Sequence, residues 1–176
     1  PACLVAIGGF SGSGKSTLAK ALAPAIGAVP GAVLVRSDET RKQLCGVDPL
    51  QRLGAEGYTA EMSQRVYEAI ADRASRVIAA GHCAIVDAVY SRPEDRAAIE
   101  RAAAAAQVPF VGLWLDAPET VLVARAERRG PDASDADAAV IRQQLARPAG
   151  SIAWHRLDAA QAPEVVLRDA IEVLRG

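Results

Sequence analysis

Residues 3–22, CLVAIGGFSGSGKSTLAKAL, decide the fold of this chain. An apolar run breaks into a turn rich in glycine and serine, and a helical pattern follows directly. The turn fits the pattern G-x-x-x-x-G-K-[ST], with Gly9, Gly14, Lys15 and Ser16 at the defining positions and Thr17 behind them. We therefore expect a strand, a tight loop and a helix in this order.

The glycine spacing of the loop has a physical reason. Gly9, Gly12 and Gly14 let the backbone adopt positive φ and approach a ligand closely, because no Cβ stands in the way. The loop N–H groups then point into one concavity at the positive end of the following helix, which suits phosphate. The residues expected to bind a nucleotide are Gly9, Ser11, Gly12, Ser13, Gly14, Lys15, Ser16 and Thr17.

Two side chains of this loop have separate expected roles. Lys15 would reach the β- and γ-phosphates, and the Ser16 hydroxyl would ligate Mg²⁺, a hard cation that prefers oxygen. The alternative is a flexible glycine loop that merely joins a strand to a helix. The complete motif in its strand, turn and helix context favours the first interpretation, so the expected cofactors are ATP and Mg²⁺.

Length and composition are typical of one domain. The chain has 176 residues, of which 51% are hydrophobic, enough for a core covered on both faces. A formal net charge of −1 gives no general attraction to nucleic acid or anionic membranes, and no apolar run is long enough to span a bilayer. We expect a single domain over residues 1–176 in a cytoplasmic protein without a membrane partner.

The cysteines and the first residue bear on the cellular context. Cys3, Cys45 and Cys83 form an odd set without metal-ligand spacing, which favours reduced, buried thiols over a metal site or disulfides. No secretory signal is expected, because residues 3–7 lead straight into the loop. Pro1 is not an initiator residue, so we expect a chain that is processed or cut from a longer protein.

Short apolar runs alternate with helical patterns along the whole chain. Expected strands cover residues 3–7, 32–36, 83–87, 110–115 and 152–157. Expected helices cover residues 15–26, 38–45, 60–80, 93–107, 118–128, 136–146 and 163–174. Near-continuous apolar strands separated by helices predict an α/β three-layer sandwich with a five-stranded parallel sheet buried on both faces.

Ligands of such sheets bind at the carboxyl ends of the strands, and three predicted strand ends are followed by candidate residues, those of the second, third and fourth strands. Asp38 follows the second strand, and Arg41 lies one helical turn later on the same face. Asp87 ends the third strand, where it would hold the hydration shell of Mg²⁺ opposite Ser16. The alternatives are that Asp38 is only a helix cap and that Arg41 is a solvated helix residue.

Two helix starts carry capping-box patterns, Ser91-x-x-Glu94 and Asp116-x-x-Glu119, each with a proline just inside. The second pattern makes Asp116 a helix cap in preference to a catalytic group. After the fourth strand, Arg125 and Arg129 share a helix face ahead of a Gly-Pro break. We expect a mobile lid over residues 125–137 that supplies these arginines to a phosphoryl group; ordinary surface charges are the alternative.

The absence of certain motifs argues against several classes of nucleotide-binding protein. No [NT]-K-x-D motif for reading guanine occurs, and no L-S-G-G-Q-like signature of transporter ATPases occurs. Asp87 is followed by Ala88, whereas motor ATPases usually place there a glutamate that activates water. An acidic group across the crevice from the phosphate loop is instead placed for an acceptor hydroxyl, which favours phosphoryl transfer.

Five segments together resemble a known family: GGFSGSGKST, RSDETRKQL, IVDAVYSRPEDR, LWLDAPETVLVARAERR and DASDAD. They are similar to the small P-loop kinases related to polynucleotide kinase and zeta toxins. The similarity is greatest to the C-terminal kinase-like domain of bacterial bifunctional aminoglycoside phosphotransferase/ATP-binding proteins, and it covers nearly the whole chain. It implies a P-loop fold with the strand order of nucleoside monophosphate kinases, and an N-terminal phosphotransferase-like domain in the full-length protein.

The resemblance also implies residue roles. Its D-x-x-R pattern makes Asp38 the general base and Arg41 an acceptor-side arginine, and its lid pair corresponds to Arg125 and Arg129. Adenylylsulfate kinases share the phosphate loop, but their acceptor signature is not recognisable in GVDPLQRLGAEGYTAEM, which argues against adenylylsulfate as the acceptor. The acceptor site, expected within residues 52–67, has no readable specificity.

The sequence thus predicts an ATP-dependent kinase that transfers the γ-phosphoryl group to a hydroxyl of a small-molecule acceptor. Asp38 would be the base, Lys15 and the two lid arginines would neutralise charge, and Asp38, Arg41 and Asp87 would contact the acceptor. Two alternatives stay open: an ATP-binding regulatory module of a larger protein, and a 5′-hydroxyl polynucleotide kinase. The net charge of −1 and an aromatic content of 4% make nucleic acid the less favoured acceptor.

Overall fold

The computed structural model describes residues 1–128, 135–147 and 149–176. Five parallel strands form one sheet in the spatial order β2-β3-β1-β4-β5. Their bounds are Leu4–Gly8 for β1, Val33–Arg36 for β2, Ala84–Asp87 for β3, Phe110–Asp116 for β4 and His155–Asp158 for β5. The predicted α/β class and the five-stranded parallel sheet are both confirmed.

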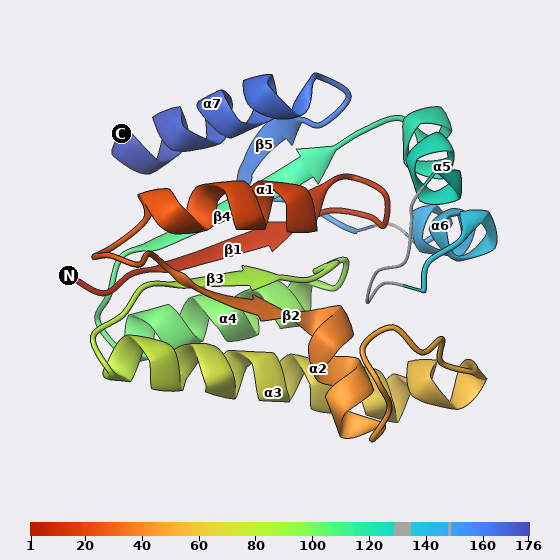
Figure 1. Ribbon diagram of the computed structural model, residues 1–176, viewed down its shortest axis with the longest axis horizontal. Helices are drawn as coiled ribbons and strands as arrows, with labels where there is room; N and C mark the ends of the chain where they lie inside the picture. Colours follow the sequence, from red (N-terminus) through yellow and green to blue (C-terminus); the bar gives the residue numbers. More distant parts are fainter. Residues whose placement is uncertain (129–134, 148) are drawn as a thin grey trace.

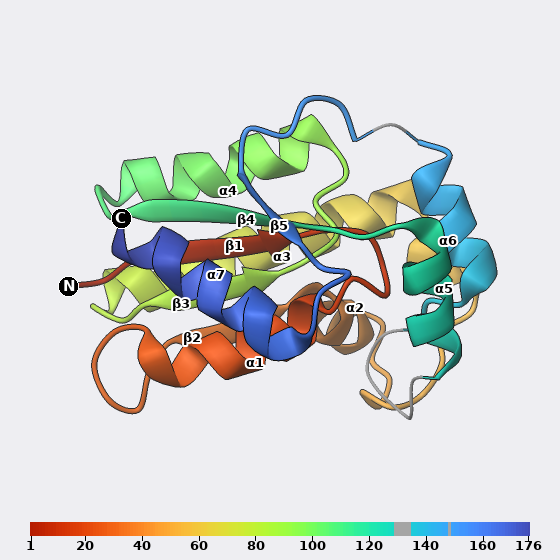
Figure 2. The same cartoon turned by 90° about the horizontal axis from the view of Figure 1, so that it is seen from above.

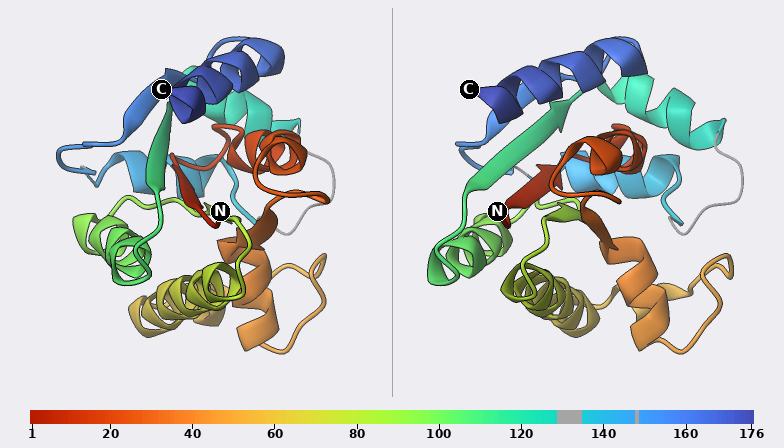
Figure 3. Two further views of the ribbon diagram at one scale, coloured as in Figure 1. Left: turned by 90° about the vertical axis from the view of Figure 1, so that its left-hand side faces the viewer. Right: turned by 60° about the vertical axis from the view of Figure 1, so that its left-hand side comes forward.

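Helices cover both faces of the sheet and give the fold three layers (Figure 1). On one face, α1 (Lys15–Leu22) packs against α7 (Pro163–Arg175). On the other face, α3 (Ala60–Ala79) packs against α4 (Pro93–Ala105). The end views in Figure 3 show the sheet between these two pairs.

The central strand β1 connects the two halves of the core. All five of its residues are buried, and its side chains alternate between the layers. Val5 and Ile7 pack in the cluster that contains α1 and α7, whereas Leu4 and Ala6 pack in the cluster that contains α3 and α4. Because β1 is fixed on both faces, it gives the loop that follows it a rigid support.

The remaining helices gather at the edge of the sheet where the strands end. α5 (Glu119–Glu127) and α6 (Ala138–Leu145) lie side by side at this edge, as Figure 2 shows from above. α2 (Ser37–Leu44) follows β2 directly, and a 3₁₀ helix, η2 (Ala55–Tyr58), precedes α3. Ligands of parallel α/β sheets bind at this edge, so these elements surround the expected site.

Both predicted capping boxes are wrong. The N-cap of α4 is Arg92 and the N-cap of α5 is Pro118, and neither makes a side-chain cap hydrogen bond. Proline favours the first helical turn and disfavours helical backbone in the residue before it, so Ser91 and Asp116 lie too early to cap. Asp116 instead accepts hydrogen bonds from Trp114 Nε1 (3.0 Å) and Arg156 Nε (2.6 Å).

Two predicted boundaries also need correction. The first helix was expected to reach residue 26, but α1 ends at Leu22, because Pro24 diverts the chain into a short 3₁₀ helix, η1 (Ala23–Ala25). The last strand was expected from residue 152, but β5 begins only at His155. Trp154 packs its ring over Gly112, where an added Cβ would lie 2.3 Å from the ring. None of the helices in the described part of the chain has the length and apolar character needed to cross a membrane.

Candidate active site

The loop between β1 and α1 has the backbone that its glycines predict. Gly9, Gly12 and Gly14 have φ values of +140°, +83° and +93°. A side chain at Gly12 would place its Cβ 2.4 Å from the backbone oxygen of Leu122 on α5, so this position requires glycine for space as well as for φ. α1 begins at Lys15, and its N-cap, Gly14, has no side chain that could accept a hydrogen bond from the first N–H groups of the helix.

The loop encloses a cavity of about 170 Å³, which we call the loop cavity. Lys15, Ser16 and Thr17 line it from α1, Asp38 lines it from α2, and Asp87 lines it from the end of β3. The structure therefore brings together candidates that are up to 76 positions apart, from Ser11 to Asp87. Within the predicted phosphate-binding set, Gly9 and Ser13 lie outside the lining: Gly9 packs against Leu115, and Ser13 is buried.

The two predicted metal ligands contact each other directly. Ser16 Oγ donates a hydrogen bond of 2.5 Å to Asp87 Oδ2, and Asp87 is only 4% exposed. A hydroxyl beside a carboxylate is an oxygen donor set that suits Mg²⁺. No group of three or more His, Cys, Asp or Glu side chains gathers as a metal site among the described residues. This pair therefore fits a Mg²⁺ ion whose other ligands come from phosphate and water.

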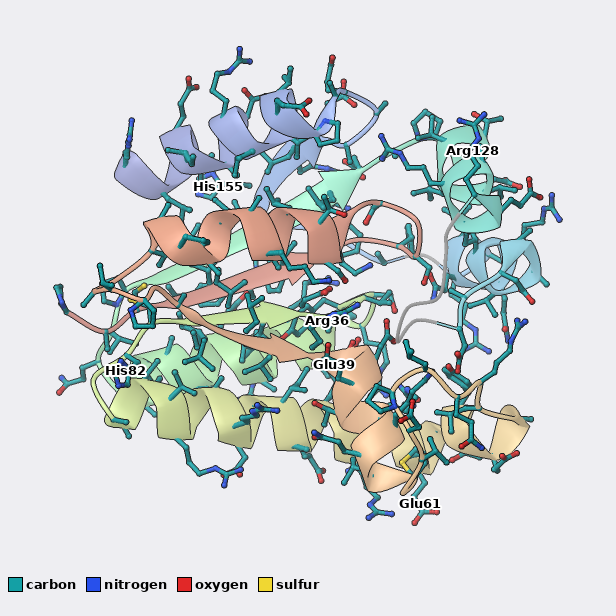
Figure 4. The ribbon with its side chains drawn as sticks, viewed as in Figure 1. Arg36, Glu39, Glu61, His82, Arg128 and His155 are labelled. Carbon is teal, nitrogen blue, oxygen red and sulfur yellow. The ribbon has the colours of Figure 1, made fainter. Side chains whose placement is uncertain are left out.

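Arg36, the last residue of β2, belongs to this site and was missed in the sequence. Its Nη2 donates a hydrogen bond of 3.0 Å to Ser16 Oγ. Its Nε lies 3.5 Å from Asp87 Oδ2. A third contact of 3.0 Å joins Nη1 to Glu39 Oε1. Figure 4 shows Arg36 and Glu39 side by side where β2 passes into α2. The signal available was an arginine ending an otherwise apolar strand.

Asp38 is held in an environment that disfavours its charge. Burial raises the pKa of its carboxyl above the ordinary value, and the neighbouring Asp87 raises it further, against opposing effects from Lys15, Arg36 and Arg41. The alternative of a helix cap is wrong, since the N-cap of α2 is Arg36 and Asp38 lies inside the helix. A carboxylate with a raised pKa that faces a cavity is a candidate general base.

A larger cavity of about 600 Å³, which we call the large cavity, begins on the other side of Asp38. Ser11, Ser37, Asp38 and Val89 line both this cavity and the loop cavity. Arg41 also lines the large cavity and is only 8% exposed, so the alternative of a solvated helix residue is wrong. Its guanidinium donates 2.8 Å to the Gly57 oxygen and lies 5.0 Å from the centre of the Tyr58 ring.

Segment 135–147 forms the outer wall of the large cavity and is fastened at two points. At one end, Asp135 accepts hydrogen bonds from Lys42 Nζ (3.0 Å), the Leu53 N–H (2.9 Å) and the Tyr58 hydroxyl (2.8 Å). Burial opposes ionisation of Asp135, but these bonds outweigh burial and lower its pKa.

At the other end of this wall, α6 is tied to the phosphate loop. Gln144 Oε1 accepts a hydrogen bond of 2.9 Å from the Ser11 N–H, and Gln144 Nε2 donates a hydrogen bond of 3.0 Å to Ser11 Oγ. The two residues are 133 positions apart. The two hydrogen bonds of Gln144 thus join the wall of the large cavity to Ser11 of the phosphate loop.

Of the two predicted lid arginines, Arg125 is among the residues that the structure describes. Arg125 donates 2.6 Å to the Ala159 oxygen and lies 3.5 Å from the Gln161 oxygen. It lines a third, mostly apolar cavity of about 280 Å³ between α1 and α7, which we call the apolar cavity. Arg129 lies outside the described residues, as does the predicted lid between residues 129 and 134.

The cysteines and histidines lie away from these cavities. Cys3, Cys45 and Cys83 are free thiols, but of the three only Cys83 is buried, so the expectation of buried thiols is wrong for Cys3 and Cys45. His82 precedes β3 and His155 begins β5, and Figure 4 shows both far from the phosphate loop. Base chemistry by histidine therefore has no candidate among the described side chains around the loop.

Known proteins with similar sequences define the family. A family model described as an AAA domain matches residues 4–149. Uncharacterized protein Rv2004c of Mycobacterium tuberculosis and uncharacterized protein Mb2027c of Mycobacterium bovis are each 30% identical to this chain over 177 residues. Each alignment covers 98% of this chain and 35% of the relative, so the chain spans about a third of the length of these curated relatives.

Solved structures share the fold at low identity. A sugar kinase from Janibacter sp. matches with a TM-score of 0.72 and 22% identity over 99% of this chain and 95% of its own. A gluconokinase from Sinorhizobium meliloti matches with a TM-score of 0.70 and 22% identity, over 99% of this chain and 92% of its own. The Mycobacterium tuberculosis APS kinase CysC, in complex with AMPPNP and APS, matches with a TM-score of 0.68 and 21% identity, over 99% of this chain and 98% of its own. These structures show the P-loop kinase fold, and the family match shows that the chain belongs to the AAA domain family.

Proposed function

We propose that this chain is an ATP-dependent kinase that transfers the γ-phosphoryl group of ATP to a hydroxyl of a small-molecule acceptor. One observation carries the proposal: Asp38 lines both the loop cavity and the large cavity. A carboxylate between a bound triphosphate and a second ligand is in the position that a general base needs. A module that only senses ATP needs no second cavity there.

ATP and the acceptor would occupy the three named cavities. We assign the triphosphate to the loop cavity, the base and ribose to the apolar cavity, and the acceptor to the large cavity. Lys15 and the first N–H groups of α1 would bind phosphate oxygens. Mg²⁺, held by Ser16 and through water by Asp87, would neutralise charge on the β- and γ-phosphates.

On the acceptor side, Asp38 would orient the attacking hydroxyl and take its proton. A carboxylate with a raised pKa is a stronger base than an ordinary aspartate, which suits this role. Arg41 would orient the acceptor from the wall of the large cavity, and Arg129 would neutralise charge that develops during transfer. Positioning and electrostatics supply most of the catalysis in such reactions.

The names of the solved neighbours support a hydroxyl acceptor, since they include a sugar kinase and a gluconokinase. We also propose that the full-length protein carries a phosphotransferase-like domain ahead of this chain. The length of the curated relatives, of which the chain covers 35%, supports a further domain. A cytoplasmic location stays a prediction.

The acceptor class is tested by ADP release. The panel contains sugars, nucleosides, aminoglycosides and a single-stranded oligonucleotide with a 5′-hydroxyl, each at low and high salt. We expect at least one small hydroxyl compound to increase ADP release above the rate with ATP alone. Stimulation only by the oligonucleotide, with steep salt dependence, would instead support a polynucleotide kinase. Stimulation by none would support the ATP-binding module.

Arg125→Ala tests the assignment of the apolar cavity. Arg125 is tied to the Ala159 and Gln161 oxygens at this cavity, so its loss should disturb nucleotide binding more than transfer. We expect the KM for ATP to rise about tenfold, the scale of one charge-assisted hydrogen bond, while kcat changes less than about threefold. Steady-state kinetics with varied ATP measure both. A large fall in kcat at unchanged KM would instead indicate that Arg125 neutralises charge in the transition state, as the lid hypothesis predicts.

A further inference from the structure

The guanidinium of Arg36 lies where the proposed metal site should bind a cation. It is within 3.0 Å of Ser16 Oγ and 3.5 Å of Asp87 Oδ2, the two oxygens that fit Mg²⁺. Arg36 is only 5% exposed and Asp87 only 4%, so water screens their interaction little. The side chain of Arg36 therefore contacts both proposed metal ligands at once.

This arrangement opposes the binding of a bare metal ion. A guanidinium carries a permanent positive charge and only donates hydrogen bonds, so it uses oxygen lone pairs that a metal would need. Its charge also compensates Asp87, the carboxylate that accepts a hydrogen bond from Ser16 Oγ. Two cations a few ångströms apart also repel each other, and they repel more strongly at a partly buried site than in water.

Glu39 gives the guanidinium a second anchor. Its Oε1 accepts from Arg36 Nη1 at 3.0 Å, one helical turn further along α2. The Glu39 side chain is 44% exposed, whereas that of Asp87 is 5% exposed, so the two anchors lie at different depths. Arg36 can thus keep an ion pair with Glu39 after it leaves Ser16 and Asp87.

We propose that Arg36 is a positioning residue that sets the Mg²⁺ requirement of the site by competing with the metal. It holds Ser16 and Asp87 while the metal is absent, and it withdraws toward Glu39 when Mg²⁺ enters together with nucleotide phosphates. The phosphates add the negative charge that shifts the competition toward the metal. The proposal rests on the proposed function only in that Mg²⁺ and ATP bind here, and it does not depend on the acceptor.

The test measures how much free Mg²⁺ is needed for ATP to stabilise the protein. At constant saturating ATP, melting temperature is recorded against free Mg²⁺, and the midpoint of the increase is compared between variants. Arg36→Gln should lower this midpoint about tenfold, because the competing cation is gone. Glu39→Gln should raise it about threefold, since Arg36 loses its outer anchor and stays on Ser16 and Asp87.

Matched controls separate this mechanism from a general effect of charge. Arg76→Gln and Glu61→Gln remove the same charges on α3, away from the loop cavity, and should leave the midpoint unchanged. In the double variant Arg36→Gln/Glu39→Gln, the effect of losing Glu39 should vanish, because Glu39 acts through Arg36.

Three results would overturn the proposal. They are an Arg36→Gln midpoint within about twofold of the wild-type midpoint, a midpoint higher than wild type, and an effect of Glu39→Gln that persists in the double variant. If Arg36→Gln does not fold, the exposed Glu39→Gln variant decides alone, and an unchanged midpoint refutes the competition. A wild-type protein that ATP never stabilises at any Mg²⁺ concentration would contradict the proposed function instead.

Discussion

Lys15→Ala should abolish the stabilisation of this protein by Mg·ATP and reduce phosphoryl transfer by about 10³-fold, the scale for losing a key electrostatic contact in a transition state. Lys15 lines the loop cavity at the start of α1, and its Nζ donates 3.2 Å to the Phe10 oxygen within the same loop. The variant should therefore fold but bind the triphosphate poorly. ATP at about 100 times its Kd should raise the wild-type melting temperature by about 5–10 °C, and the variant should show almost none of this increase.

Lys20→Ala is the matched control for this prediction. Lys20 lies on the same helix, is exposed and lines neither the loop cavity nor the apolar cavity. Its loss should leave both the ATP-induced increase and the transfer rate near the wild-type values. A Lys15→Ala protein with the full ATP-induced increase would show that this lysine does not bind phosphate.

Asp38→Asn should keep the fold and ATP binding but reduce transfer by roughly 10²–10⁴-fold, the range for removing a general base. Asparagine has nearly the same size and shape, but it cannot accept the proton of the attacking hydroxyl. The measurement is the transfer rate with any acceptor that supports ADP release, together with the ATP-induced change in melting temperature. Asp72→Asn on the exposed side of α3 controls for loss of a charge, since the Asp72 side chain is 67% exposed.

The raised pKa of Asp38 adds two further signatures to this prediction. A base must be deprotonated, so the transfer rate should fall as pH drops through this raised pKa, at a higher pH than for an ordinary aspartate. Ionisation of Asp38 lowers the free energy of unfolding, whereas ionisation of a carboxylate in an ion pair raises it. Because the folded state raises the pKa, ionisation favours unfolding at neutral pH, and Asp38→Asn should be at least as stable as wild type there.

A clear result against the base would be full transfer activity in Asp38→Asn with an unchanged pH profile. A loss of activity that accompanies a lower melting temperature would also contradict the account, because it would indicate a structural role. The contrast between stability and transfer is therefore the informative quantity.

The sequence predicted the sheet and the phosphate loop because both depend on local patterns. The strands are short apolar runs, and the loop places its glycines and Lys15 within one turn of the chain. The strand-end rule then placed Asp38 and Asp87 correctly at the loop cavity, because parallel strands bring their carboxyl ends to one edge.

What the sequence did not reveal depends on contacts between distant segments. The bonds of Gln144 to Ser11 and of Asp135 to Leu53 join residues 133 and 82 positions apart, and no spacing rule predicts them. Arg36 ends an apolar strand, where nothing local distinguishes a solvated arginine from one directed at Ser16 and Asp87. The failed capping boxes show how one proline can move a helix start that a pattern of four residues places elsewhere.

Labelled ATP distinguishes a protein that transfers phosphate from one that only senses ATP. The protein is incubated with ATP labelled at the γ-phosphate and with the acceptors that increase ADP release, and the label is followed. We predict a labelled phosphate ester on the acceptor hydroxyl with wild-type protein and almost none with Asp38→Asn, although both proteins bind ATP. Label that remains on ATP, or appears only as inorganic phosphate with every acceptor, would contradict this prediction.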